Sequence, residues 1–587
     1  MYKIIIIYIF LFLTEITYAQ YIDYHTYKHS KAAEILNERG EIAFEFIADT
    51  KEQINKDLTH IISIDRVSQL PVGLGYKVVA YASESQFTEF LRRNINFEII
   101  GPVQLRSLKM ADSINEMENW DAYPTYQVYE NMMAEFEKKY PELCRIDTIL
   151  SSTPSGNYSI LVAKISDNVV ESENEPQFLY SSTIHGNETG GFILMLRLID
   201  HLLKNYSTDQ LIRELVDEVE IWICPLANPD GTYFKSVPAG STIINAKRSN
   251  LLNVNLNRNY PDPDTGPHPD GNIYQAETLA FMTFADRHHF NMGANFHSGA
   301  ELLNYPWDAW VSDDNPNADA DWWEKVCTDY VDTARIVNKT YMTSDFADGV
   351  SEGGDWYVIN GGRQDYMNFF KKCREVTIEI DNESITQTQN LNEKWNENYR
   401  SMLNFIREST FGLRGIITDS VTGQPMKAMV WVNGYDQEND SSQVYSALPV
   451  GNYHKYMIEG NYNITFSASG YYPKTFDEVV LKNGIATTLN VDLVPVSNWI
   501  NEENTLSQIE IYPNPASEVL NIDSTPVSIG KLTISVYSST GQSVFGHIQI
   551  NTGTNESIDI SKFTNGLYIL KITAGSKSRS VKFQKIK

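Results

Sequence analysis

The sequence predicts a chain of several domains, in which an α/β sandwich around a largely buried sheet is followed by two small β units. Its 587 residues exceed the roughly 100–200 residues of a single domain. Between residues 120 and 410, apolar runs of strand length alternate with helical patterns, which favours a sheet covered by helices. Beyond residue 412, short alternating strands are separated by turn residues, which is typical of β-sandwiches.

Residues 1–19 predict a signal peptide. Lys3 gives a positive start, residues 4–13 form an apolar run of ten, and Ala19 ends a small-residue cleavage motif. The run is too short to span a bilayer as a mature helix, although an uncleaved membrane anchor is the alternative. No later run reaches about 18 apolar residues, so we expect a mature chain without a membrane span.

Residues 20–110 combine two alternating runs, Ala43–Ile47 and Tyr76–Tyr81, with a helical pattern over Glu84–Arg93. We expect a small α/β domain here. The polar stretch 109–118 that follows indicates a linker or a processing site.

Residues 120–410 contain helices and strands that are predicted from their apolar periods. The helical stretches are 126–139, which Pro141 closes, and 192–204. The strand-length apolar runs are 177–184, 219–224, 291–296 and 376–380.

Two β units are expected after residue 410. The first covers about residues 412–496, where segments such as Asn461–Gly470 and Thr487–Leu493 alternate polar and apolar side chains. Residues 501–508 form a polar linker, and the second unit covers residues 509–587.

The charge and the cysteines narrow the class of protein. The net charge of −28 repels nucleic acid and anionic membranes and suits cationic ligands. None of the four cysteines lies at CxxC spacing, which argues against a Cys-ligated zinc site. Cys224 lies in the apolar run 219–224, where we expect a free buried thiol. A Cys327–Cys373 bridge stays open, because sequence alone does not decide the pairing.

A potential metal site begins with His185 and Glu188, which follow a predicted strand and precede a helix. A histidine and a carboxylate three residues apart can hold one ion together, and zinc accepts both ligand types. His297, at the end of the run 291–296, would complete two nitrogens and one carboxylate and leave a fourth position for water. Taken alone, such a histidine is more often a hydrogen-bonded core residue.

Other polar residues could supply the remaining chemistry. Glu379 interrupts the apolar run 376–380. Burying a carboxyl group there costs free energy, so the group is expected to be paired or to take part in catalysis. It could move a proton from a metal-bound water to a leaving amine, although an outward-facing strand residue is the alternative. Asn257 and Arg258 offer donors that suit a terminal carboxylate.

In this order, these segments resemble the zinc carboxypeptidase family, which includes the pancreatic carboxypeptidases A and B and the regulatory carboxypeptidases E, N, M and D. The resemblance covers about residues 120–410. It implies an α/β sandwich with a mixed sheet, one zinc ion per chain and hydrolysis of the C-terminal peptide bond of peptides. The roles that it implies are metal ligand for His185, Glu188 and His297, general base for Glu379, oxyanion stabiliser for Arg248, carboxylate clamp for Asn257 and Arg258, and mobile cap for Tyr357.

The resemblance also bears on the side chain that is removed. Asp308 and Gln364 match specificity-pocket positions of the basic-specific regulatory members, which implies a preference for C-terminal Lys or Arg. The alternatives are that Asp308 points to solvent, or that Arg363 turns inward and neutralises it. Asn255 departs from the family, which has an Asp there to support the first zinc histidine. This change could cost some of the roughly 10–100-fold in zinc affinity that changes around metal ligands cause.

The flanking parts carry resemblances of their own. Residues 412–496 resemble the transthyretin-like β domain of the regulatory carboxypeptidases. Residues 509–587 resemble the C-terminal sorting domain of type IX secretion substrates, which implies export through the outer membrane by that machinery. By its position, the domain at 20–110 could be a prosegment.

We therefore expect a monomeric zinc carboxypeptidase, secreted or at the cell surface, that acts on peptide or protein C-termini and not on nucleic acid. One alternative is a peptidoglycan or γ-glutamyl amidase on the same scaffold, against which Asn257, Arg258 and Asp308 argue. The other is a catalytically silent secreted binding protein, against which the filled catalytic positions argue.

Overall fold

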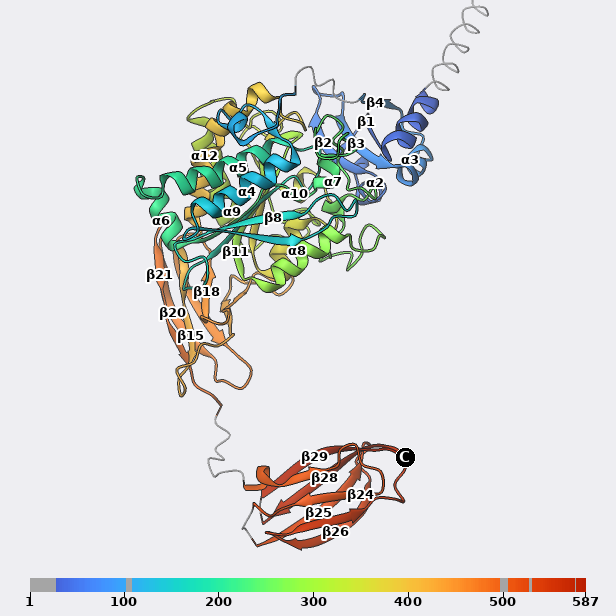
Figure 1. Ribbon diagram of the computed structural model, residues 1–587, viewed down its shortest axis with the longest axis vertical. Helices are drawn as coiled ribbons and strands as arrows, with labels where there is room; N and C mark the ends of the chain where they lie inside the picture. Colours follow the sequence, from blue (N-terminus) through green and yellow to red (C-terminus); the bar gives the residue numbers. More distant parts are fainter. Residues whose placement is uncertain (1–27, 102–107, 497–504, 527–529, 576) are drawn as a thin grey trace, which may run out of the picture. The chain divides into compact units, whose positions relative to one another are not determined.

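The computed structural model describes residues 28–101, 108–496, 505–526, 530–575 and 577–587 (Figure 1). The predicted signal peptide lies outside the described residues. The chain forms two compact units, one ending at Pro495 and the other beginning at Val496. Within the described residues, no helix has the length and apolar content needed to cross a bilayer.

The centre of the first unit is an eight-stranded mixed sheet with the order β13-β12-β14-β11-β9-β10-β8-β7. The middle strands β14, β11, β9 and β10 run parallel, and antiparallel strands flank them. The bounds are β7 (Cys144–Leu150), β8 (Ile160–Ile165), β9 (Gln177–Ser182), β10 (Glu220–Cys224), β11 (Phe290–His297), β12 (Ala300–Tyr305), β13 (Val350–Glu352) and β14 (Arg374–Asp381). The predicted runs 177–184, 219–224, 291–296 and 376–380 therefore all form strands.

Helices cover both faces of this sheet (Figure 1). Successive strand residues point to opposite faces, so Tyr180 packs in the core under one helical layer and Leu179 in the core under the other. The first layer contains α4 (Tyr126–Lys139), α5 (Gly190–Asn205), α6 (Gln210–Glu218), α9 (Ala320–Arg335) and α12 (Leu391–Glu408). The second contains α8 (Ala276–Arg287) and the π-helical turn η4 (Tyr366–Phe370). This is the α/β sandwich that the sequence predicts.

The loops contain short elements. They are α7 (Pro229–Thr232), η3 (Leu256–Arg258), α10 (Gly353–Trp356), α11 (Arg363–Asp365) and η5 (Thr388–Asn390). Of these, η3 and α11 carry polar residues of the site.

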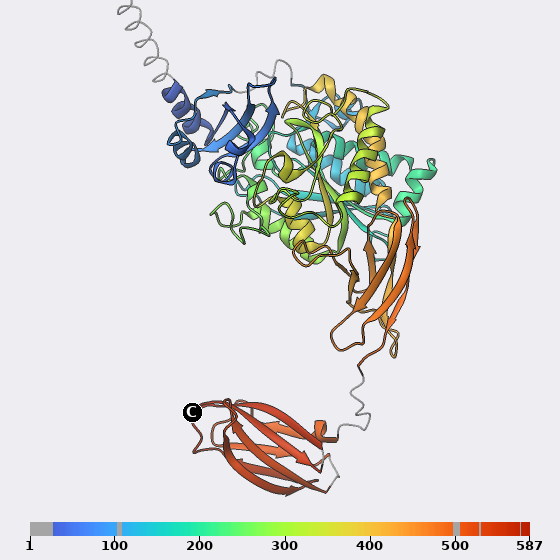
Figure 2. The same ribbon diagram turned by 180° about the vertical axis from the view of Figure 1, so that it is seen from behind.

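The N-terminal part, here called the N-terminal cover (residues 28–101), has an antiparallel sheet of order β2-β3-β1-β4. Its core continues through Ala300, Leu302 and Trp356 into the part that contains the eight-stranded sheet (residues 120–410, here called the catalytic part for the role expected of it), and the two parts adjoin in both views (Figures 1 and 2). Its elements are β1 (Glu41–Ala48), η1 (Lys51–Gln53), α2 (Lys56–Ile61), β2 (Ser63–Gln69), β3 (Tyr76–Ser83), α3 (Glu84–Leu91) and β4 (Phe97–Ile99).

Two β-rich parts follow residue 410. The β-sandwich of the first unit pairs β18-β15-β21, with β22 beside β15, against β17-β16-β19-β20. Its strands are β15 (Gly412–Asp419), β16 (Met429–Val432), β17 (Val444–Tyr445), β18 (Asn452–Lys455), β19 (Gly460–Ser467), β20 (Lys474–Leu481), β21 (Ala486–Thr488) and β22 (Val491–Leu493).

The second unit has one sheet of order β23-β24-β27 and another of order β26-β25-β28-β29 around its own core. The strands are β23 (Glu510–Tyr512), β24 (Val519–Asp523), β25 (Lys531–Ser538), β26 (Ser543–Asn551), β27 (Asn555–Asp559), β28 (Gly566–Ala574) and β29 (Lys577–Lys585).

Two predicted linkers are folded where the structure describes them. In the stretch 109–118, β5 (Met110–Ala111) pairs with β6 (Tyr123–Pro124), η2 (Ile114–Met117) follows, and Met117 is buried in the main core. At the end of the second linker, η6 (Thr505–Gln508) places Leu506 in the core of the second unit. Each stretch thus places one apolar side chain in a core, while residues 501–504 of the second lie outside the described residues.

Candidate active site

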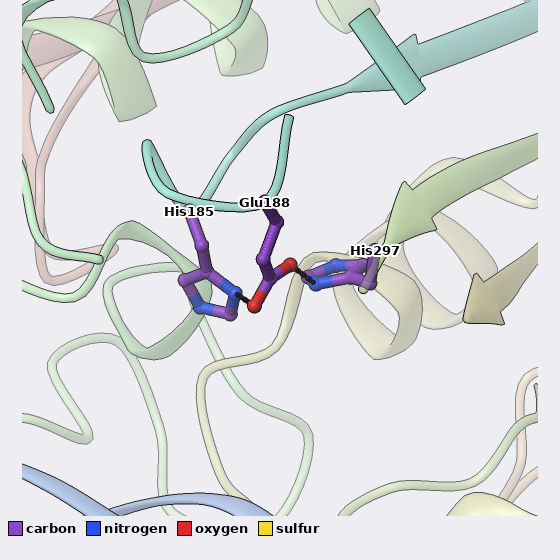
Figure 3. A group of neighbouring side chains, drawn as sticks. All are labelled: His185, Glu188 and His297. Atoms are coloured by element: carbon purple, nitrogen blue, oxygen red, sulfur yellow. Dashed lines mark hydrogen bonds and ion pairs between the residues drawn. The ribbon is translucent and has the colours of Figure 1, made fainter. Parts of the chain in front are cut away.

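Three potential metal ligands lie close enough to share one ion. His185 and Glu188 come from the loop between β9 and α5, and His297 ends β11 (Figure 3). Glu188 Oε1 lies 2.8 Å from His185 Nδ1, and Glu188 Oε2 lies 2.7 Å from His297 Nδ1. One ligand atom from each residue lies within 4.8 Å of the others, and all three side chains are buried. The structure thus brings together the three residues that the sequence analysis named as potential ligands.

The surroundings of the histidines fit a metal site of the zinc type. Asn255 Oδ1 accepts from His185 Nε2 at 3.0 Å, which leaves the lone pair on the Nδ1 that faces Glu188. Burial, followed by the charge of Arg248, lowers the pKa of His185 to about 3, so its ring is neutral. Two imidazoles and one carboxylate are a ligand set that zinc accepts. Asn255 thus makes the contact expected of an amide oxygen at this position.

Glu379 lies beside this cluster because two neighbouring strands bring it there. In the parallel pair β11–β14, His297 and Glu379 are direct partners. Glu379 is 8% exposed, and its Oε2 has no hydrogen-bond partner among the described residues. Burial, followed by the charges of Glu188 and Asp65, raises the pKa of Glu379 well above the usual carboxyl range. A carboxyl group in this environment readily holds a proton.

Arg248 lies beside the same cluster and is held from the N-terminal cover. Its Nη1 donates to Glu188 Oε1 at 2.5 Å and forms an ion pair with Asp65 of β2. Glu41 accepts from its backbone N–H at 2.7 Å. Asp65 of the cover is therefore paired with the Arg248 guanidinium, which the resemblance assigns to stabilising a substrate oxyanion.

The two residues expected to clamp a terminal carboxylate lie in η3. Arg258 Nη2 donates to the carbonyl of Ile64 at 3.5 Å, and its buried Nε has no partner among the described residues. Asn257 Oδ1 accepts from the backbone N–H of Arg363 at 2.8 Å. The amide N–H groups of Asn257 are left for other acceptors. The hydroxyl of Tyr357 donates to the same Ile64 carbonyl at 3.4 Å. The cover thus contacts both Arg258 and the expected cap.

Asp308 is buried in the loop after β12. Gln364 Nε2 donates to Asp308 Oδ1 at 3.0 Å, whereas Gln364 Oε1 is unpartnered among the described residues. Burial raises the pKa of Asp308 to about 7, although Arg258 opposes this shift. Gly353 lies against the carboxylate, since a Cβ there would come within 1.9 Å of Asp308 Oδ1. The alternative that Asp308 points to solvent is excluded.

Arg363 does not neutralise Asp308. Its Nη2 lies 2.8 Å from Glu375 Oε2, and its Nη1 donates to Ser181. All of these groups are buried beneath the sheet, and the guanidinium carbon lies 4.8 Å from the ring centre of Phe281. The guanidinium of Arg363 is thus already ion-paired with Glu375 of β14.

The sequence analysis missed the contribution of β2 to this region. Its residues Ser63, Ile64 and Asp65 contact Arg248, Asn255 and Arg258. The only local signal was an acidic residue inside the apolar run 61–67, and that pattern names no partner. A cavity of about 770 Å³, lined in part by Ser63, Asn255 and Arg258, remains beside the strand.

Comparison with known proteins agrees with this arrangement. Residues 129–401 match the family described as zinc carboxypeptidase. The chain is 31% identical over 382 residues to carboxypeptidase SOL1 of Arabidopsis thaliana, covering 64% of this chain and 72% of that protein. It is 30% identical over 306 residues to carboxypeptidase M of Mus musculus, covering 50% of this chain and 67% of that protein.

A third relative is much longer. Carboxypeptidase D of Rattus norvegicus is 31% identical over 395 residues, which cover 65% of this chain but 27% of that protein. Residues 510–586 match the secretion system C-terminal sorting domain, which confirms the resemblance of the chain end. On the ligand cluster, the sheet that carries it and these similarities, the chain belongs to the zinc carboxypeptidase family.

Proposed function

We propose that this protein is a zinc-dependent carboxypeptidase that removes C-terminal Lys or Arg from peptides or proteins. The observation that carries the proposal is the cluster of His185, Glu188 and His297 directly beside Glu379. Zinc bound by these three residues, one ion per chain, would supply a Lewis acid that activates water and polarises the scissile carbonyl.

The residues around the cluster can perform the remaining steps. Arg258 has an unpartnered Nε, and it would bind the terminal carboxylate together with the amide of Asn257. Arg248 would stabilise the negative charge that develops on the carbonyl oxygen. Glu379, whose pKa is raised well above the usual range, would accept a proton from water and deliver it to the leaving amine. Tyr357 would close over the bound substrate.

The preference for a basic residue follows from the pocket around Asp308. A buried carboxylate with only an amide for a partner can be satisfied by a substrate cation. Gln364 contributes a second, unpartnered oxygen. The commitment of Arg363 to Glu375 leaves the charge of Asp308 available, which supports a Lys or Arg preference.

The N-terminal cover is proposed to hold the enzyme in a latent state. Asp65 pairs with Arg248, and the Ile64 carbonyl accepts from Arg258 and Tyr357. These are the groups that a substrate would need, so a substrate and the cover cannot bind together. Residues 20–110 would then act as a prosegment.

The proposed location rests on the C-terminal domain. The sorting domain at 510–586 supports export by type IX machinery, and the protein would be released or held at the cell surface. We expect a monomer in solution.

Two alternative functions receive less support. An amidase acting on peptidoglycan or γ-glutamyl bonds would not need the buried Asp308 beside Arg258. A silent binding protein would not need a carboxyl group as costly as Glu379, which is buried with one oxygen unpaired.

Digestion of peptides that end in each residue type, read by mass spectrometry, tests the proposal. Full-length zinc-loaded protein would be compared before and after limited proteolysis of the cover, with and without a chelator. Removal of the cover should increase cleavage after Lys and Arg, and the chelator should abolish it. Glu379→Gln should keep zinc and lose about 10²–10⁴-fold in turnover, whereas Glu383→Gln, an exposed neighbour, should not. Turnover above a tenth of wild type in Glu379→Gln would assign the proton transfer to another group.

A further inference from the structure

Arg66, the residue after Asp65 in β2, forms a two-pronged ion pair with Asp345. Its Nε lies 3.1 Å from Asp345 Oδ1 and its Nη2 lies 3.3 Å from Oδ2. Ser68 of the same strand donates to Oδ1 at 3.3 Å. The side chain of Asp345 is 1% exposed, so this carboxylate is buried by the cover.

Within the described part of the catalytic domain, Asp345 has no cationic partner. The hydroxyl of Ser344 donates to Oδ2 at 2.9 Å, and all its other bonds come from β2. If the cover left, both carboxylate oxygens of Asp345 would lose the cation that now pairs with them. A guanidinium or ammonium group is the ligand that suits such a fork.

The loop that carries Asp345 is tied to the strand of the proposed general base. Ser344 Oγ also lies 3.1 Å from Asn382 Oδ1, and Asn382 directly follows β14, which carries Glu379. The neighbouring Tyr341 donates to the carbonyl of Ile380 at 2.9 Å. Asp345 therefore lies near Glu379, and its charge contributes to the raised pKa of that residue.

Three consecutive residues of β2 contact the proposed substrate-binding groups, and their order gives the order of those groups along a bound substrate. Ile64 contacts Arg258, Asp65 contacts Arg248, and Arg66 contacts Asp345. The register of β2 with β3 shifts between Ile64 and Arg66, and such a bulge allows consecutive side chains to reach the same neighbour. The order is thus carboxylate clamp, oxyanion donor, Asp345. With a substrate bound by the proposed clamp, Asp345 would lie on the side of the scissile bond away from the substrate's C-terminus.

We propose that Asp345 forms a subsite for a Lys or Arg side chain upstream of the scissile bond, with Arg66 occupying it in the latent chain. The inference rests on the proposed function. The substrate would then carry two basic residues. The C-terminal one, which is removed, binds at Asp308, and the upstream one binds at Asp345. The net charge of −28 also favours such cationic peptides.

The test uses peptides that all end in Arg and differ only upstream, with Arg or the neutral isostere citrulline at each of the two positions before the terminal residue. Full-length zinc-loaded protein is assayed after limited proteolysis of the cover. At one of these positions, wild type should favour Arg about ten-fold in kcat/KM, as expected for a charge-assisted pair. Asp345→Asn should lose that preference, while the ratio between peptides ending in Arg and in Phe stays. Asp348→Asn, an exposed carboxylate of the same loop, is the matched control and should keep both preferences.

Failure of this inference differs from failure of the proposed function. Equal rates for Arg and citrulline peptides in wild type, with the terminal Arg still removed, would overturn the subsite alone. An unchanged preference in Asp345→Asn would do the same. If no peptide is cleaved, the affinities of the same peptides for the proteolysed Glu379→Gln protein decide: a ten-fold advantage for upstream Arg supports the subsite, and equal affinities reject it. The wild-type comparison also stands if Asp345→Asn does not fold.

Discussion

Two buried clusters of charged side chains in the first unit differ in how their charges are matched. In the sandwich anchor (Asp319, Arg374, Asp436 and Lys455), Asp319 lies 2.7 Å from Arg374, and Lys455 lies 2.7 Å from Asp436. Two carboxylates thus meet two cations, where the β-sandwich joins the catalytic part. In the cleft cluster (Glu188, Arg248, Arg258, Asp308 and Glu379), Glu379 Oε2 and Arg258 Nε lack partners among the described residues.

Equal burial gives opposite pKa shifts in the two clusters. In the anchor, Arg374 and Lys455 outweigh the effect of burial and lower the pKa of Asp319. In the cleft, burial dominates at Asp308 and Glu379 and raises their pKa values, whereas the charges of His185, His297 and Arg248 outweigh burial at Glu188 and lower its pKa. Each carboxylate of the anchor is ion-paired, and only Arg374 Nε lacks a partner among the described residues, whereas neither Asp308 nor Glu379 of the cleft forms an ion pair with a described residue. An unbalanced buried cluster is therefore the better indicator of a working site.

The largest expected effect is on the anchor. Lys455→Met leaves two buried carboxylates with one cation and should lower the free energy of unfolding by about 3–5 kcal/mol, as measured by urea denaturation. Lys482→Met, an exposed lysine of the same sandwich, should change it little. Equal stability of the two variants would mean that the anchor is not the element that couples the sandwich to the catalytic part.

In the cleft, substitution should change selectivity more than stability. Asp308→Asn should lower the ratio of kcat/KM for matched peptides ending in Arg and in Phe, because a charge-assisted bond of about 1.5–3 kcal/mol is lost. That corresponds to about ten- to hundred-fold, measured after removal of the cover. A wild type that prefers Phe, or a variant with an unchanged ratio, would show that Asp308 does not set the choice.

The ion pair between Asp65 and Arg248 links the cleft to the cover. Asp65→Asn should weaken this contact and raise the activity of the unproteolysed chain by about ten-fold, the value of one lost bond between charged groups. Asp49→Asn, an exposed substitution in the cover, is the control. If activity rises equally in both variants, or in neither, Asp65 does not hold the cover in place.

The smallest expected effect is a pH dependence of selectivity. The pKa of Asp308 is raised to about 7, so its carboxyl group is neutral below that pH and charged above it. The Arg-to-Phe ratio should therefore rise by a few-fold as the pH passes through about 7 and then level off, as a titration curve requires. The ratio for Asp308→Asn should be flat. A wild-type ratio that falls with rising pH would contradict the assignment.

Residues on strands and at strand ends could be placed from sequence, and residues on long loops could not. His297 ends one apolar run and Glu379 interrupts another, so each could be assigned to a strand, whereas the pairing of these two strands came only with the structure. The direction of Arg363 depends on Ser181 and Glu375, which come from two other strands. The reach of β2 into the cleft depends on contacts nearly two hundred residues apart in sequence. No local pattern encodes such pairings.

The direct pairing of His297 with Glu379 between β11 and β14 has an evolutionary consequence. The spacing between a metal ligand and the proposed base is set by backbone hydrogen bonds at the centre of the sheet, and a slip of one residue would turn one side chain to the opposite face. Insertions can hardly alter that distance without destroying the core. Asp308 and Asp345, the residues proposed to select the substrate, lie on loops, where changes in length cost little. Selection can therefore retune which peptide end is accepted while the machinery for bond cleavage stays fixed.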